Sequence, residues 1–412
     1  MTKLTKLNNG MTVISDSIDN IETISLGIFV NVGSVNETDN QKGLSHFLEH
    51  MVFKGTTTRS ALQISNEIES VGGIMNAFTG QEMTGYHVKI LKEHLPLAID
   101  IISDMLQNPT FDQVEFDRER KVVIQEIKMC IDSPDDYISG LFQSTCFTNE
   151  RLGSPILGFE DGILSYTPDD IRNYMDSNYS IDKMVLVASG NINHDNLVEL
   201  ASNFIVKLKQ FHTNLVEKQK YTGGYVFKEK DLEQTHVMMG YEGYSYTDKN
   251  KYKLKLLSAI LGSGCSSRLF NEVREKRGLV YTVYSTTDSF RDTGTFGVYA
   301  ACEPEKTEEV ISIVKRELTK IQSNLSTEEL NKAKMQLKSS ILMGLENNSN
   351  RMERIASQYL LEGKLTEIGE TIDNIMCLNV DDIQEVAKNI VNNTHYTLTV
   401  LGKPSNTNFY EI

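Results

Sequence analysis

His46, Glu49 and His50 are spaced as metal chemistry requires, within a stretch that we expect to form a short helix closed by Gly55. At 3.6 residues per turn, His46 and His50 differ by about 40° around the helix axis, and Glu49 lies about 60° to the other side of His46. The three side chains therefore share one face. Two imidazoles placed in this way can bind one zinc ion, and a carboxylate beside them can take a proton from water.

The order His-x-x-Glu-His is the inverted form of the commoner metalloprotease helix motif. Two ordinary helix histidines beside a solvated glutamate would give the same pattern. A third ligand on another element is therefore needed before the motif indicates a metal site.

Glu119 and Glu126 are candidates for that ligand, because they stand seven residues apart in a second expected helix. On a helix about 20° separates them, so they line one face two turns apart. The apolar residues 122–124 and 127 indicate that this helix is mostly buried. Buried carboxylates are costly unless they are paired, protonated or bound to a cation, so a metal would explain them. A solvated acidic stripe on a long helix is the alternative.

Together, the motif from His46 to His50 and the later Glu119 and Glu126 closely resemble the pitrilysin and insulinase family of zinc peptidases. The sequence is similar to the β subunit of mitochondrial processing peptidase and to the homodimeric bacterial relatives of that subunit. The resemblance implies that His46, His50 and Glu126 bind Zn²⁺. It also implies that Glu49 is the base acting on water, and that Glu119 is an acidic partner behind the ligands.

The elements around these residues alternate between helix and strand. Residues 23–32 alternate apolar and other side chains and predict a half-buried strand, and Ser60 with Gln63 forms a capping box for a helix. Residues 75–79 and 84–91 predict a hairpin that turns at Gly80. We therefore expect an α+β fold in which each domain is a mostly antiparallel sheet with helices packed on one face.

The chain repeats itself at an offset of 209 to 212 residues, which indicates a tandem duplication. We expect an N-terminal zinc-binding domain over residues 1–210 and a homologous C-terminal domain over residues 225–412. The second copy has no histidine where the motif helix should recur, so only the first can hold the metal. The matching segments are Thr84-Gly85 and Thr293-Gly294, Asp169-Asp170 and Asp381-Asp382, and residues 185–190 and 397–402.

An extended peptide is held most simply as an added strand at an exposed sheet edge. Residues 72–79 match the family segment that does this. The resemblance implies that Asn76 and Ala77 contact the substrate backbone and that Phe78 helps to form an apolar pocket beyond the scissile bond. A plain hairpin with a core phenylalanine is the alternative.

In the second half, Arg274 and Tyr281 have the spacing of the family's substrate-binding pair. A cation such as Arg274 and a phenol such as that of Tyr281 could bind a substrate carbonyl or its oxyanion. The longer relatives enclose a chamber with four such domains, whereas this chain is expected to have two. The resemblance therefore implies that the pair reaches the zinc of a partner chain in a symmetric homodimer.

In the processing peptidases, two acidic residues recognise an arginine that lies two residues before the cleaved bond of the substrate. They are placed ten and fourteen positions after the glutamate ligand. The matching positions here are Asp136 and Gly140. One acid is kept in shortened form and the other is missing. The resemblance therefore implies a substrate-binding role for Asp136 but does not imply strict recognition of arginine.

Composition limits the remaining possibilities. The chain has 412 residues, 40% hydrophobic and 24% charged, as in ordinary globular proteins, and no apolar run long enough for a membrane span. Its formal charge of −15 argues against nucleic acid and favours basic peptides, although solubility alone would explain it. Five widely spaced cysteines and the lack of an apolar leader lead us to expect a cytoplasmic protein.

These features predict a zinc-dependent endopeptidase that cleaves unstructured, basic peptides or presequence-like segments. The alternative is a subunit of the same fold that is non-catalytic, or that binds peptides and works only with a different partner chain.

Overall fold

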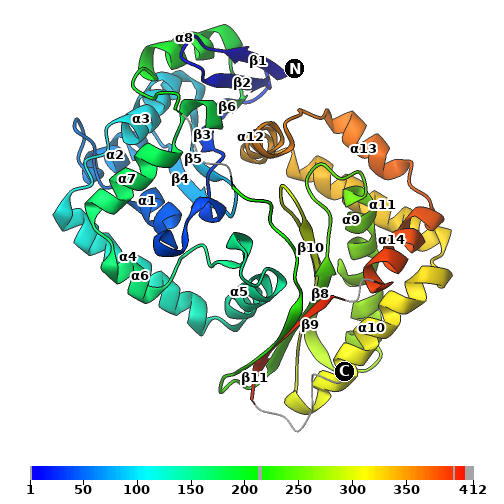
Figure 1. The fold of residues 1–412 in the computed structure, drawn as a ribbon. Helices are drawn as coiled ribbons and strands as arrows, with labels where there is room; N and C mark the ends of the chain where they lie inside the picture. Colours follow the sequence, from blue (N-terminus) through cyan, green and yellow to red (C-terminus); the bar gives the residue numbers. More distant parts are fainter. Residues whose placement is uncertain (1, 212–215, 393–394, 404–412) are drawn as a thin grey trace. The chain divides into compact units, whose positions relative to one another are not determined.

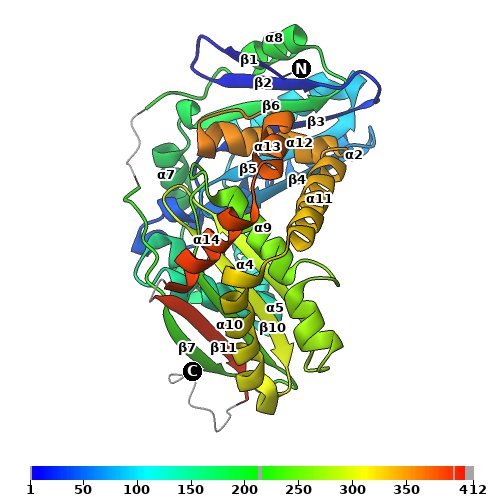
Figure 2. The ribbon, with the colours of Figure 1, turned by 90° about the vertical axis from the view of Figure 1, so that its right-hand side faces the viewer.

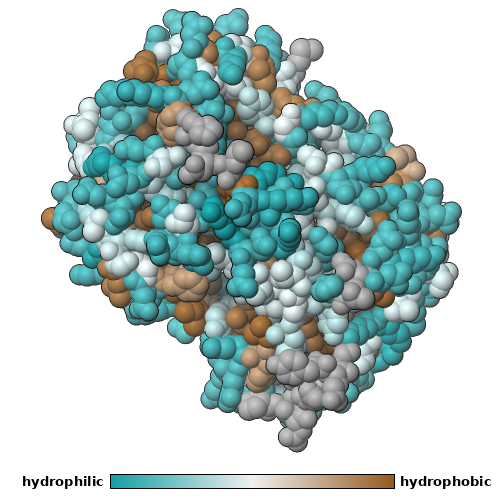
Figure 3. Space-filling model, in the orientation of Figure 1, coloured by the Kyte–Doolittle hydropathy of each residue, from teal (hydrophilic) through white to brown (hydrophobic). Residues whose placement is uncertain are grey.

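The computed structural model describes residues 2–211, 216–392 and 395–403, and these form two compact units, each built on one sheet (Figure 1). Both sheets are mostly antiparallel and carry packed helices, so the predicted α+β fold is confirmed, but helices cover both faces of each sheet and not one face as expected. No described helix is long and apolar enough to cross a membrane. The face drawn in Figure 3 is mainly hydrophilic, with hydrophobic residues in separate patches.

The sheet of the first unit has six strands in the order β1-β2-β6-β3-β5-β4. Only β2 and β6 pair in parallel, and β4 lies at the edge. The predicted hairpin is present as β4 and β5. The strands are β1 Thr2–Lys6, β2 Thr12–Ser17, β3 Thr23–Val30, β4 Ile74–Thr79, β5 Thr84–Leu91 and β6 Met184–Gly190.

The sheet of the second unit repeats this plan with five strands in the order β7-β11-β8-β10-β9. Its parallel pair, β7 and β11, answers to β2 and β6, and its edge strand β9 answers to β4. A shared order that includes the parallel pair is what a tandem duplication predicts. The strands are β7 Gly224–Glu229, β8 Thr235–Glu242, β9 Val280–Ser289, β10 Gly294–Cys302 and β11 Tyr396–Gly402.

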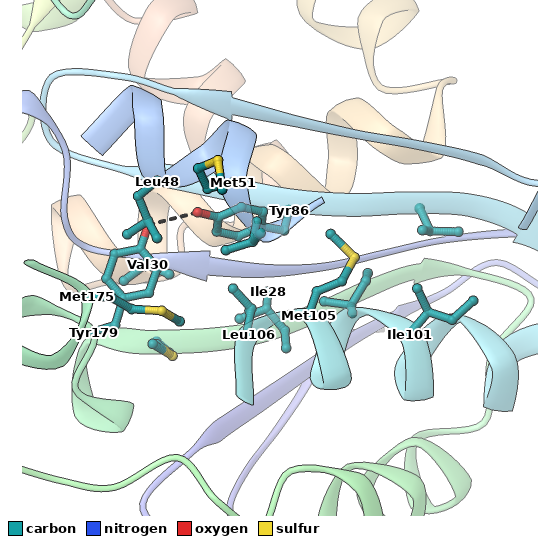
Figure 4. Packing of buried hydrophobic residues seen from close by; sticks show 14 of the residues in the cluster. Ile28, Val30, Leu48, Met51, Tyr86, Ile101, Met105, Leu106, Met175 and Tyr179 are labelled. Atoms are coloured by element: carbon teal, nitrogen blue, oxygen red, sulfur yellow. Dashed lines mark hydrogen bonds between the residues drawn. The ribbon is translucent and has the colours of Figure 1, made fainter. Parts of the chain in front are cut away.

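One face of the first sheet packs against helices of the first half of the chain. Alternate residues of β3, such as Ile28 and Val30, enter a core that includes Met105 and Leu106 (Figure 4). The helices are α1 Leu44–Val52, α2 Ala61–Glu69, α3 Leu95–Gln107, α4 Gln113–Asp132, α6 Glu160–Ser165, α7 Pro168–Asn178 and α8 His194–Phe204. The predicted capping box of Ser60 begins α2.

The opposite face of the first sheet is covered by a helix from the second half of the sequence. Phe29 and Val187, which point away from the first core, pack with Met352 and Ile355 of α12 (Asn348–Ser357). Figure 2 shows α12 beside β6 and β3. The first unit thus takes in Met343–Leu365.

The second unit mirrors this arrangement. Helices α9, α10 and α14 pack with one face of its sheet, and α5 (Pro134–Cys146) from the first half covers the other, where Phe142 lies against Gly240. The second unit thus takes in Met129–Gly153. Besides α5, the helices of this unit are α9 Lys251–Gly262, α10 Thr307–Asn324, α11 Thr327–Gly344, α13 Ile368–Met376 and α14 Val380–Asn392.

Compactness therefore divides the chain differently from the sequence repeat. The boundary between residues 1–210 and 225–412 stays a prediction about the duplication, and residues 212–215 of that junction lie outside the described residues.

Polar contacts fix α12 to the first sheet. Arg351 Nε lies 2.6 Å from Asp16 Oδ2 on β2, and Asp16 is 3% exposed. A hydrogen bond of 2.8 Å joins the hydroxyls of Ser349 and Ser25. Because a buried carboxylate needs a partner, the position of α12 depends on the pair of Arg351 and Asp16.

The N-terminus of α1 is held by a buried carboxylate. Gly43, at φ +92°, has no side chain to cap the helix. Glu37 replaces that cap, since Gly43 N donates to its Oε2 at 2.8 Å and Ser45 N donates to its Oε1 at 2.7 Å. Burial raises the pKa of Glu37 to about 8, although the two backbone donors oppose the shift.

The chain beyond α1 is held by a second carboxylate, Asp104 of α3. The hydroxyls of Thr56 and Thr58 each donate to Asp104 Oδ2 at 2.6 Å, and Arg59 Nη1 donates to it at 3.0 Å. Both ends of α1 are therefore tied to buried acidic groups.

Replacing Arg351 with Ala should lower the free energy of unfolding by about 3 kcal/mol, because it leaves Asp16 buried without its cation. Denaturant unfolding of the whole chain measures the loss. Lys92→Ala, which breaks the exposed pair of Lys92 and Glu22, is the control and should cost less than about 1 kcal/mol. Equal losses in the two variants would contradict the buried anchor.

Glu37 should make the stability of the metal-free protein depend on pH. The pKa of Glu37 is about 8 in the folded protein, against an ordinary value of 4.5. Between these two pH values the folded protein keeps a proton on Glu37 that the unfolded chain has lost, so the protein loses stability as the pH rises through 8. Glu37→Gln cannot titrate. The melting temperature should therefore fall more from pH 6 to pH 9 in the wild type than in the variant. An equal fall in the two proteins would refute the raised pKa of Glu37.

Candidate metal centre

Two histidines of α1 face away from the core of the first unit. Phe47, Leu48 and Met51 of the same helix are fully buried in that core. The rings of His46 and His50 lie on another side of the helix, with centroids 4.6 Å apart and planes at 63°. The predicted sharing of one helix face by the two imidazoles is therefore present.

Glu126 of α4 completes the group. Its Oε2 lies 3.5 Å from Nε2 of His46 and 3.5 Å from Nε2 of His50. Two ligand atoms at the corners of a zinc tetrahedron are about 3.4 Å apart, given bonds of about 2.1 Å, so the separations suit a shared ion. Within the described residues this is the one group of three or more candidate ligands whose atoms lie within 4.8 Å of one another.

The donor set also fits zinc chemically. Two imidazoles and one carboxylate are a common set for catalytic zinc, and they leave a fourth position open. Burial, with a smaller effect of His50, lowers the pKa of His46 to about 3 and keeps it in the neutral form that binds metals. Burial would also lower the pKa of His50, but surrounding carboxylates, that of Glu119 first among them, raise it above its ordinary value.

Glu119 lies behind His50. His50 Nδ1 donates to Glu119 Oε2 at 3.0 Å, and Lys54 Nζ lies 2.7 Å from Glu119 Oε1. Burial alone would raise the pKa of Glu119, but the contacts with His50 and Lys54 lower it. The carboxylate orients the His50 ring with Nε2 toward Glu126.

The carboxylate of Glu49 accepts a hydrogen bond from the edge strand of the sheet. The hydroxyl of Thr79 on β4 donates to Glu49 Oε2 at 2.6 Å. Burial raises the pKa of Glu49, and the nearby charge of Glu126 adds to the shift. One carboxylate oxygen is thereby fixed, and a raised pKa suits a base that must accept and return a proton near neutral pH.

The strand residues expected to bind substrate lie on the edge strand β4. Ala77 packs against the core beneath α1, while Asn76 is exposed and its Oδ1 accepts a hydrogen bond of 2.9 Å from Ala77 N. Phe78 points to the other face of the sheet, 6.3 Å from Phe29 and 6.4 Å from His87 between ring centroids. Their roles in binding stay predictions.

The other predicted substrate residues belong to the second unit. Asp136 lies on α5, Arg274 in a π-helical turn over Phe270–Glu275, and Tyr281 on β9, where it is 76% exposed. The Arg274 guanidinium lies 4.7 Å from the ring centroid of Phe270 and 5.0 Å from that of Tyr281. The rings therefore hold the guanidinium, and what these residues do for a substrate stays a prediction.

Sequence reasoning gave no role to three residues that support the centre, namely Glu37, Lys54 and Thr79. Lys54 could have been found, since the expected helix closed at Gly55 and Lys54 follows His50 by four residues, a spacing that places two side chains on one side of a helix. No local signal connects Glu37 or Thr79 with the motif, because their contacts arise only when a loop and a strand pack against α1.

Comparison with known proteins identifies a family for this chain. Residues 12–160 match the family described as insulinase, peptidase family M16, and residues 165–337 match the family described as the peptidase M16 inactive domain. The second match fits the finding that the candidate ligands all lie in the first unit.

The relatives extend over almost the whole chain. An uncharacterized zinc protease of Rickettsia felis is 38% identical over 94% of both chains, and one of Bacillus subtilis is 32% identical over 98% of this chain and 99% of its own. The crystal structure of a protease from Helicobacter pylori, 26% identical, superposes with a TM-score of 0.92 over 98% of this chain and 99% of its own. From these matches and the two-unit fold, the chain belongs to the insulinase family of peptidases, family M16.

Proposed function

We propose that this chain is a zinc-dependent endopeptidase whose centre is formed by His46, His50 and Glu126. The observation that carries the proposal is the position of one carboxylate oxygen at 3.5 Å from both imidazole nitrogens. A zinc ion held there supplies Lewis-acid chemistry, since it polarises a peptide carbonyl and makes water acidic enough to lose a proton near neutral pH.

The chain's own residues then move the proton. Glu49, fixed at Oε2 by Thr79, accepts the proton of the attacking water and returns it to the leaving amine. Glu119 keeps the His50 ring in place through Nδ1. Thr79 thus orients Glu49, and Glu119 orients His50, as catalysis by preorganised groups requires.

The substrate class follows from the edge strand and the charge. β4 lies at the edge of its sheet, so an extended peptide can add to it as a further strand beside Asn76 and Ala77. A formal charge of −15 favours basic, unstructured peptides or presequence-like segments. Asp136, at the first turn of α5 and exposed, is the acid that would select a basic side chain.

The proposal includes a symmetric homodimer, in which Arg274 and Tyr281 of each chain serve the centre of the other. Tyr281 is 76% exposed, and stacking against Phe270 preorganises Arg274. A partner that is another copy of this chain needs no second gene product. We place the protein in the cytoplasm, a choice supported by its five free cysteines.

The alternative is a subunit of the same fold that does not cleave, or cleaves only with a different chain. The description of residues 165–337 as an inactive domain agrees with the finding that, among the described residues, the candidate metal ligands lie in the first unit. This description does not distinguish a peptidase from a subunit that does not cleave. Intact candidate ligands in the first unit favour the peptidase.

Replacing Glu49 with Gln should leave zinc bound and reduce peptide cleavage by roughly 10²- to 10⁴-fold, because the amide cannot accept the proton. Zinc content and initial rates on a library of basic, unstructured peptides measure the two effects. Glu69→Gln, at an exposed position of α2, is the control and should be fully active. Near-normal turnover by Glu49→Gln would remove Glu49 from the mechanism.

The homodimer can be tested with two inactive variants. Mixing Glu49→Gln with Tyr281→Phe should restore about a quarter of wild-type activity after subunit exchange, because half of the dimers are mixed and each mixed dimer has one complete centre. Gel filtration verifies the dimer. If the mixture stays as inactive as either variant alone, Tyr281 does not serve the centre of a partner chain.

A further inference from the structure

A chain of two polar contacts leads outward from His50. Its Nδ1 donates to Glu119 Oε2 at 3.0 Å, and the other oxygen of that carboxylate, Oε1, lies 2.7 Å from Lys54 Nζ. Both oxygens of Glu119 are therefore engaged, one toward the metal ligand and one toward the cation. The carboxylate cannot turn without breaking one of these contacts.

The position of Lys54 follows from the end of α1. The helix ends at Val52, and Lys54 stands four residues after His50, with its N donating to Met51 O at 3.1 Å. Its side chain lies near that of His50, since both contact the carboxylate of Glu119. Glu119 reaches the same place from α4 and is 7% exposed. The ion pair is thus partly shielded from water, where such pairs are worth more than on the surface.

Other cations near Glu119 in the sequence are directed elsewhere. Arg118 pairs with Glu115, and Arg120 pairs with Asp117 and donates to Tyr166 O. Within the part of the chain that the structure describes, Lys54 is the cation paired with Glu119.

The two histidines differ in their support. His50 is fixed through Nδ1, whereas Nδ1 of His46 is buried with no hydrogen-bond partner among the described residues. Metal-binding histidines are normally oriented by a bond at the second ring nitrogen, and loss of that partner weakens metal binding. The preorganisation of the centre therefore depends mainly on the contacts behind His50.

We propose that Lys54 is a positioning residue of the metal centre, which holds Glu119 in the rotamer that orients the His50 ring. This inference rests on the proposed function, since it assumes that His46, His50 and Glu126 bind zinc. Lys54 touches neither the ion nor the substrate, and it acts only through Glu119.

The test is the zinc affinity of the full-length protein, measured by competition with a chelator at constant pH. Lys54→Met keeps an unbranched apolar stem and removes the charge. Lys42→Met is the matched control, because Lys42 flanks the other end of α1 and is exposed to a similar degree, 30% against 28%. Among the described residues its one ion pair is with Asp39, which is 95% exposed. Both changes remove one positive charge beside an end of α1, so the control shows what the loss of a charge alone does to zinc binding.

We expect Lys54→Met to bind zinc about tenfold more weakly, Lys42→Met to bind it no more weakly than the wild type, and Lys54→Arg to retain affinity through a new ion pair. The melting temperature of each metal-free variant separates this effect from loss of the fold. In a Glu119→Gln background, Lys54→Met should cause no further loss, because the two residues act in one pathway.

Unchanged zinc affinity in Lys54→Met, or an equal loss in the Glu119→Gln background, would overturn the role of Lys54 while leaving the zinc centre intact. A wild-type protein that binds no zinc would instead overturn the proposed function itself.

Discussion

The centre depends on one carboxylate of α4 lying between two imidazoles of α1. Glu126 Oε2 is 3.5 Å from Nε2 of both His46 and His50, a separation too long for a strong hydrogen bond and suited to a shared ion. The structure must therefore fix α1 and α4 against each other, and α1 has only nine residues, a length that is marginal for an isolated helix.

Buried acidic groups supply much of that fixation. Glu37 holds the first amides of α1, Asp104 holds the residues after it, and Glu119 joins its second half to α4. Each is an anchor of the helix that carries the candidate ligands. The β4 strand extends the same system, because its Thr79 fixes Glu49 and the strand lies at the edge of its sheet. The proposed base and the proposed peptide-binding edge are thereby linked through one strand.

Local periodicity explains what the sequence could predict. The face shared by His46 and His50, and the stripe of Glu119 and Glu126, follow from helical spacing alone. The hairpin of β4 and β5 follows from turn residues and alternation. Each of these predictions needed only residues close together in the chain.

Contacts between distant elements could not be predicted in this way. An amphipathic pattern shows that α5 and α12 bury one face, but not that each packs on the sheet of the unit built mainly from the other half. The hydrogen bonds of Glu37 depend on how a loop folds over α1, and the stacking of Arg274 between two rings depends on a π-helical turn. These features require the tertiary structure.

The coordination of zinc in the purified protein tests the central claim most directly, and X-ray absorption at the zinc edge measures it. The account predicts one four-coordinate ion per chain, with two imidazole nitrogens at about 2.0–2.1 Å and the remaining ligands all oxygen. Replacing Glu126 with Gln should remove one oxygen ligand or the ion itself. Sulfur in the coordination sphere, or a spectrum without imidazole, would contradict the account.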